Sequence, residues 1–114
     1  MATLYKICPR PLWSEAERVG VFRGSPADHH DGFIHLSTAD QVVETAARHF
    51  AGQSELLLVW IDSEKLHNRL KWERSRGGAL FPHLYGNLDM AAVTRVEPLP
   101  LGAAGHHVFP PFGD

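Results

Sequence analysis

An unbroken apolar run in the middle of the chain constrains the fold more than any other feature. The segment 56–61 (LLLVWI) contains no polar residue. A strand with one face in water alternates apolar and polar side chains, whereas a strand without that alternation is buried on both faces. We therefore predict a central strand at 56–61. The run is far shorter than the roughly 20 apolar residues that cross a bilayer, so we expect no membrane partner.

Two other segments carry the signals that begin helices. Pro11 suits a first helical turn, which predicts a helix over 11–19. Thr38 and Gln41 match a capping box ahead of an apolar stripe, which predicts a helix over 39–50. The remaining pattern predicts a polar loop and several strands: a loop at 24–31 and strands at 3–7, 21–22, 33–37, 70–73, 80–85 and 92–98. This order predicts an α+β fold with two main helices and a mixed, largely antiparallel sheet.

The length and charge of the chain limit the kinds of partner that it binds. Its 114 residues fit one domain, 1–114, with a core at 1–100 and a Gly- and Pro-rich tail at 101–114 that is able to dock. The net charge of -2 offers no electrostatic footprint for nucleic-acid backbones, so we expect no strong nucleic-acid binding. Cys8 is the single cysteine and no signal peptide precedes it, which predicts a cytoplasmic protein. The oligomeric state is not predicted.

The densest group of polar side chains lies at 31–38 (DGFIHLST). Alternate side chains of a strand share a face, so His35 and Ser37 point the same way. The strand leads into a helix N-terminus, where free N–H groups attract an anion or a polarised ligand oxygen. One interpretation is a ligand site that includes Thr38. The alternative is that Ser37 and Thr38 only cap the helix and that His35 is a hydrogen-bonded core histidine.

A second group of polar and aromatic side chains lies at 81–86 (FPHLYG). In an extended segment His83 and Tyr85 share a face with Phe81, an arrangement that is able to hold a planar base or ring. The alternative is an ordinary half-buried strand. Glu73 lies between the two groups in the sequence. It either orients an imidazole or binds ribose hydroxyls, or it is simply solvated.

The eight histidines also raise the question of a metal site. His29, His30, Asp31 and His35 lie close together in the sequence, but their spacing matches neither a helical i, i+4 pair nor a Cys-rich zinc pattern. We therefore expect no metal. A nucleophilic pair of Cys8 with a histidine is a further alternative, although nothing near Cys8 marks it as activated.

Several motifs follow one another along the chain. They are Leu4-Tyr5-Lys6-Ile7, Trp13-x-x-Ala16-x-x-x-Gly20, Asp31-Gly-Phe-Ile-His35-Leu-Ser37-Thr38, Trp72-Glu73 and Phe81-Pro-His83-Leu-Tyr85-Gly86. This series covers nearly the whole chain and resembles an uncharacterised bacterial family, catalogued as domain of unknown function 952. The resemblance implies an ADP-ribosyltransferase-like fold, a small split α+β sheet whose cleft holds NAD in active relatives.

Within that fold, the first three motifs look like the corresponding pieces of RNA 2′-phosphotransferases, which use NAD as the acceptor for a phosphate left on RNA. The resemblance implies that His35 belongs to a nucleotide pocket. Lys6 stands where many NAD-using relatives carry a histidine; the sequence alone leaves it as a phosphate partner or a surface charge. Glu73 is the candidate for the glutamate of toxin-type transferases.

Three hypotheses about function follow. The first is a pocket for a small nucleotide-like ligand, with NAD as the candidate cofactor, and with transfer or hydrolysis at the ribose C1′. Its expected catalytic residues are His35, Glu73 and His83, and its expected cofactor-binding residues are Lys6, Ser37, Thr38 and Tyr85. The second is a non-enzymatic binding or accessory module, which a lysine at position 6 favours. The third is a metal-dependent hydrolase that uses the histidines.

Overall fold

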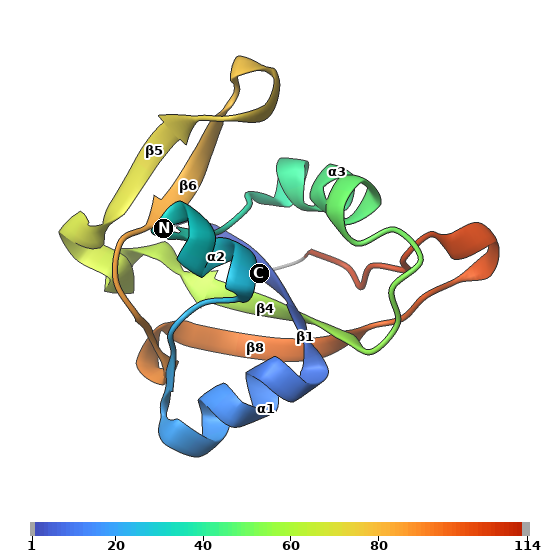
Figure 1. Cartoon of the computed structure of the whole chain (residues 1–114), viewed down its shortest axis with the longest axis horizontal. Helices are drawn as coiled ribbons and strands as arrows, with labels where there is room; N and C mark the ends of the chain where they lie inside the picture. Colours follow the sequence, from blue (N-terminus) through green and yellow to red (C-terminus); the bar gives the residue numbers. More distant parts are fainter. Residues whose placement is uncertain (1, 113–114) are drawn as a thin grey trace.

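The apolar run forms the central strand of the molecule, as predicted. The computed structural model describes residues 2–112, apart from the side chain of Arg76. Strand β4 (Leu56–Asp62) pairs antiparallel with β1 (Thr3–Pro9) on one side and with β8 (Val93–Leu99) on the other. Figure 1 shows these three strands crossing the middle of the molecule.

Short helices and strands alternate along the rest of the chain. They are α1 (Arg10–Val19), β2 (Val21–Phe22), α2 (Pro26–Asp31), β3 (Ile34–His35), α3 (Ala39–His49), η1 (Ser63–Arg69), β5 (Leu70–Arg74), η2 (Arg76–Gly78), β6 (Leu80–Leu84), β7 (Leu88–Asp89), η3 (Met90–Ala92) and η4 (Ala103–Gly105). The strand pairings within residues 2–112 are all antiparallel. The fold is therefore a small mixed α/β structure with antiparallel sheets, in agreement with the predicted class.

Strand β4 is buried on both faces because its alternate side chains enter two different cores. Leu57 and Val59 pack with α1, β2, β3 and β6 in the first core. Leu56 and Leu58 pack with α3 in the second core. Helices α1 and α3 accordingly lie on opposite sides of the central strands in Figure 1. The sequence of β4 lacks polar alternation because both of its faces are buried in apolar cores.

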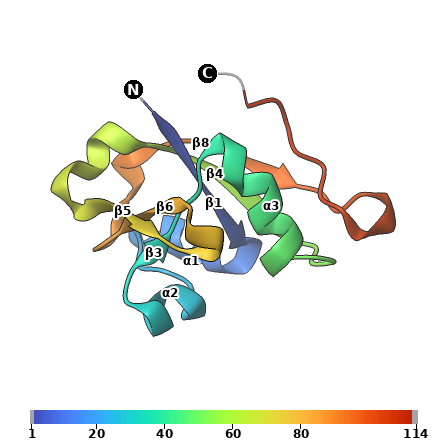
Figure 2. The same ribbon diagram turned by 90° about the horizontal axis from the view of Figure 1, so that it is seen from above.

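A second sheet lies beside the first and forms the wall of the candidate site. Its strands run in the order β3-β6-β5, and Figure 2 shows them next to one another. The two sheets are joined by a bridge in which Tyr5 of β1 and Ser37 exchange backbone hydrogen bonds of 2.8 and 2.9 Å. Beyond that bridge the chain turns from β3 into α3, and space remains between the sheets.

The structure corrects two sequence predictions near the site. The expected loop at 24–31 contains helix α2, and the expected strand at 33–37 is regular only at Ile34–His35. Helix α2 begins with Ser25, whose hydroxyl accepts from the Asp28 N–H at 3.2 Å while the Asp28 carboxylate accepts from the Ser25 N–H at 2.8 Å. This reciprocal capping box stabilises a helix too short to produce a periodic apolar stripe.

The C-terminal segment docks on the second core. Phe109 and Phe112 pack against it, and the Phe112 ring lies 5.3 Å from the ring of Tyr5. The predicted unit 1–114 and tail 101–114 include positions 1, 113 and 114, which lie outside the described residues. Within the described part of the chain, no helix is long and apolar enough to cross a membrane.

Candidate ligand-binding site

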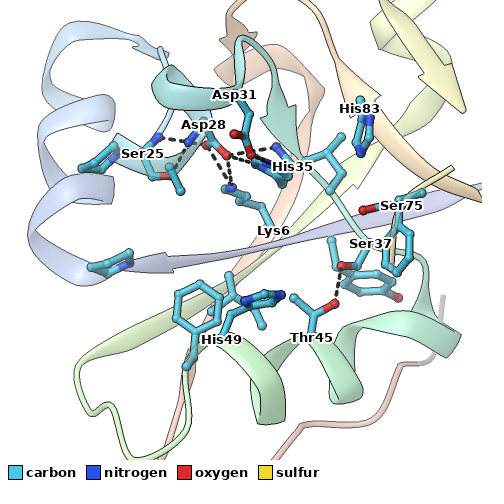
Figure 3. A pocket seen from close by; sticks show the side chains of 18 of the residues that line it. Lys6, Ser25, Asp28, Asp31, His35, Ser37, Thr45, His49, Ser75 and His83 are labelled. Carbon is cyan, nitrogen blue, oxygen red and sulfur yellow. Dashed lines mark hydrogen bonds and ion pairs between the residues drawn. The ribbon is translucent and has the colours of Figure 1, made fainter. Parts of the chain in front are cut away.

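A cavity of about 660 Å³ occupies the space between the two sheets. Strand β1 forms one wall, β3 and β6 form another, and α2 and α3 cover it from two sides (Figure 3). Its volume lies within the range of small-molecule sites, about 300–1,000 Å³. Its polar lining residues are Lys6, Ser25, Asp28, Asp31, His35, Ser37, Thr45, His49, Ser75 and His83; its apolar and aromatic ones include Tyr5, Ile7, Leu12, Leu36, Phe50 and Phe81.

Asp28 of α2 is the centre of the polar wall. Its carboxylate binds the Lys6 ammonium at 2.9 and 3.1 Å, accepts from the His35 backbone N–H at 3.0 Å and contacts the His35 ring at 2.6 Å. Burial by itself raises the pKa of Asp28, but the hydrogen bond from His35, the charge of Lys6 and backbone donors outweigh it and hold the pKa well below the usual range. Asp28 is therefore ionised at neutral pH.

The structure excludes one of the two roles that the sequence left open for Lys6. Its side chain is only 7% exposed, and its ammonium is paired with Asp28. Lys6 is therefore not a surface charge, and its role as a phosphate partner stays a prediction. An ion pair with this degree of burial needs both partners, because removing one leaves the other charge buried and uncompensated.

His35 lies between two carboxylates. Its Nδ1 is 2.6 Å from an Asp28 oxygen and its Nε2 is 2.8 Å from an Asp31 oxygen. The hydrogen bond from His30, together with the nearby His35, lowers the pKa of Asp31. The result is a chain of contacts, Lys6–Asp28–His35–Asp31, along one side of the cavity (Figure 3).

His83 lies directly across the ladder from His35, because β3 and β6 pair these two residues in register. Their ring centroids are 5.8 Å apart. His83 Nδ1 is 2.8 Å from Glu73 Oε1, and the Tyr85 hydroxyl donates to the same oxygen at 2.7 Å. These contacts lower the pKa of Glu73, with the His83 bond as the main cause, and raise the pKa of Tyr85. The Phe33 ring stacks on His83 at 3.9 Å.

Ser37 and Thr38, at the junction of β3 and α3, have different roles. Ser37 is 5% exposed, and its hydroxyl lies 3.3 Å from the Thr45 hydroxyl at the cavity wall. Thr38 belongs to the capping box of α3, in which Gln41 Oε1 accepts from the Thr38 N–H at 3.1 Å. Thr38 is not among the described lining residues of the cavity. The capping interpretation therefore fits Thr38, and Ser37 faces the cavity.

The structure thus brings the two predicted groups of residues together. Lys6, His35, Ser37 and His83 line the same cavity. Glu73 and Tyr85 are not among its described lining residues. The Glu73 carboxylate contacts His83, and the Tyr85 hydroxyl donates to the same carboxylate. Their assignments as catalytic or cofactor-binding residues remain predictions.

Sequence reasoning missed five polar residues of the site, Ser25, Asp28, Thr45, His49 and Ser75. Thr45 and His49 lie on the α3 side of the cavity, and Asp28 forms its charged centre. The pattern Ser25-Pro-x-Asp28 is a recognisable helix start that would have placed Asp28 at the beginning of a helix. No local pattern links Asp28 to Lys6, which lies 22 residues away in the sequence.

Two alternative chemistries find little support in the geometry. Burial raises the pKa of the Cys8 thiol to about 12, so a Cys8 thiolate nucleophile is not available at neutral pH. Among residues 2–112, no group of three or more His, Cys, Asp or Glu side chains is placed to hold a metal ion. His29 and His30 are exposed on α2, and His30 contacts Asp31 at 3.0 Å.

The fold and the cavity describe a class of protein: a small α/β fold with antiparallel sheets and a cavity lined by histidine and aspartate side chains. The chain belongs to the family described as protein of unknown function, DUF952, whose model matches residues 7–96. No curated protein matches the sequence.

Solved structures of one bacterial protein are similar to this chain over almost all of its length. The crystal structure of protein CC0527 from Caulobacter crescentus is 49% identical, with a TM-score of 0.90 and 93% of each chain covered. The solution NMR structure of CC0527 is 50% identical, with a TM-score of 0.84, covering 93% of this chain and 91% of that one. A crystal structure of a CC0527 double mutant has a TM-score of 0.89 at 48% identity, with 93% of each chain covered.

Proposed function

We propose that the cavity binds a nucleotide-like ligand, NAD or an ADP-ribose-like molecule, on an ADP-ribosyltransferase-like scaffold. The observation that carries the proposal is the position of His35 and His83. They come from motifs far apart in the sequence, pair in register across β3 and β6, and line one cavity. A packed apolar filling between these two motifs would have argued for purely structural histidines.

The chemistry of the lining supports a ligand with both a planar ring and polar substituents. Tyr5, Phe50 and Phe81 supply aromatic surface within the cavity, while Ser37 and the carboxylates supply hydrogen-bonding partners. Aromatic side chains stack on planar bases, and carboxylates accept hydrogen bonds from ribose hydroxyls. A nucleoside unit contains both kinds of group.

The proposed reaction is transfer or hydrolysis at the ribose C1′. In hydrolysis of NAD, the bond between C1′ and the nicotinamide nitrogen breaks, and its electron pair leaves with nicotinamide. Water then supplies the oxygen that bonds to C1′ and releases a proton. The sugar becomes cation-like in the transition state, and ionised carboxylates near the cavity stabilise such a charge.

A non-enzymatic binding module is the second candidate, and a specific observation favours it. Lys6 and both ring nitrogens of His35 are already engaged by carboxylates. No proton acceptor is therefore free at His35 in this arrangement. Incubation with labelled NAD separates the candidates: released nicotinamide indicates an enzyme, whereas binding without release indicates a module.

Isothermal titration with NAD and with ADP-ribose tests the proposal itself. We expect binding to the unchanged protein and weaker binding to His35→Asn and His83→Ala. His29→Ala is the matched control, because His29 is exposed on α2 and is not among the described lining residues. Thermal unfolding of each variant confirms that it is folded. No heat with either ligand at millimolar concentration in the unchanged protein would contradict the proposal.

A further inference from the structure

Three carboxylates contact the two histidines, and they differ in how many acceptor positions remain for a ligand. Asp28 is 2% exposed in its side chain and binds Lys6, Ser25 and His35. Its oxygens are saturated by protein donors, so Asp28 holds other groups in place.

Glu73 is the carboxylate that the sequence favoured, but its position does not suit direct contact. Its Oε1 accepts from both His83 and Tyr85, and Glu73 is not among the described residues of the cavity wall. Its contact with His83 Nδ1 fixes the orientation of that ring. Glu73 thus acts on the cavity through His83.

Asp31 combines the properties that the other two lack. It lines the cavity, its side chain is 43% exposed, and its two oxygens each have one imidazole neighbour, His35 at 2.8 Å and His30 at 3.0 Å. An ionised carboxylate has about four acceptor positions, so at least one on each oxygen remains for a ligand.

We propose that Asp31 is the residue that binds the hydroxyls of the ribose that carries the reacting C1′, and that His35 is its positioning residue. This inference rests on the proposed function and names the group within it that contacts the sugar. The chain Lys6–Asp28–His35 fixes the imidazole from the buried side, and the imidazole fixes the carboxylate of Asp31 at the cavity. A vicinal diol donates two hydrogen bonds, which matches a carboxylate with free acceptor positions on both oxygens.

The test compares two ligands that differ only in the proposed contact. One is NAD, and the other is the NAD analogue whose nicotinamide-side ribose lacks the 2′ and 3′ hydroxyls. We expect the unchanged protein to bind NAD at least about tenfold more tightly than the analogue, because hydrogen bonds to a charged group contribute strongly. In Asp31→Asn this preference is expected to shrink to less than about threefold, with little change for the analogue.

Asp89→Asn is the matched control, since Asp89 is exposed in β7 and is not among the described lining residues. It is expected to keep the full preference for NAD. Equal loss of both ligands in Asp31→Asn would indicate a merely structural role and overturn the inference. So would equal binding of both ligands by the unchanged protein, which leaves the proposed function standing. Binding of neither ligand would remove the proposed function and this inference together.

Discussion

Asp28 connects the stability of the fold to the geometry of the site. It is buried, and it holds Lys6 of β1 and His35 of β3 from the first turn of α2. Each of these contacts joins a different element. A change at Asp28 is therefore expected to alter both the free energy of unfolding and the arrangement of the cavity wall.

The first prediction concerns Asp28→Asn. The substitution leaves the Lys6 ammonium buried without a counter-charge, so it should lower the free energy of unfolding by about 3 kcal/mol or more. Urea unfolding measures the loss, with Asp89→Asn as the exposed control. A loss below about 1 kcal/mol would show that the ion pair is unimportant for stability.

The second prediction is the pH dependence that Asp28 produces. Its pKa in the folded protein is lowered, so the unfolded chain takes up a proton first as the solution is acidified. The stabilisation is complete above the unfolded value of about 4 and is lost as the pH falls below it. Unfolding measured from pH 6 to pH 2 should show a decline below about pH 4 that is steeper for the unchanged protein than for Asp28→Asn. Parallel declines would contradict this assignment.

At the scale of the elements, the sequence predicted the parts whose pattern is local. Strand β4 was predictable because its uninterrupted apolar run requires two buried faces, and α3 because Thr38 and Gln41 mark its start. Helix α2 was missed because Pro26–Asp31 is mostly polar and too short for a periodic stripe. Its signal lies in the capping pair Ser25 and Asp28.

The candidate site was predictable only where its residues belong to a local sequence pattern. Strand alternation placed His35 and Ser37 on one face, and both line the cavity. The ion pair of Lys6 with Asp28 was not predictable, because it joins elements that have no common local pattern. The pairing of Glu73 with His83 depends on the register of β5 and β6, which places Glu73 opposite Phe81.

The third prediction concerns the attachment of α3 to the second sheet. Gln41 accepts from the Thr38 N–H at 3.1 Å and donates to the Leu80 carbonyl of β6 at 2.8 Å. Gln41→Ala removes both bonds and should lower the free energy of unfolding by about 1–2 kcal/mol. Chemical denaturation gives the value, and Gln53→Ala, in an exposed loop, is the control.

Gln41→Glu separates the two contacts, because a carboxylate keeps the acceptor for Thr38 and loses the donor to Leu80. An intermediate loss is expected for this variant. If Gln41→Ala and Gln53→Ala unfold alike, the link between α3 and β6 does not contribute to stability.

At the scale of the whole molecule, the cavity lies beside the bridge of Tyr5 and Ser37 that joins the two sheets, and both of these residues line it. The two cores lie on opposite faces of β4, the first with α1, β3 and β6, and the second with α3 and the docked C-terminal aromatic residues. Polar side chains from both walls meet in the cavity beside these cores.

The most direct test of the account is an NMR titration that observes all histidine side chains at once. Imidazole nitrogen and carbon signals are followed while ADP-ribose is added to the unchanged protein. We predict that His35 and His83 shift together along one saturating curve, while the exposed His29 keeps its position. Unchanged signals of His35 and His83 at millimolar ADP-ribose, or a shift of only one of the two, would contradict a shared ligand site between the sheets.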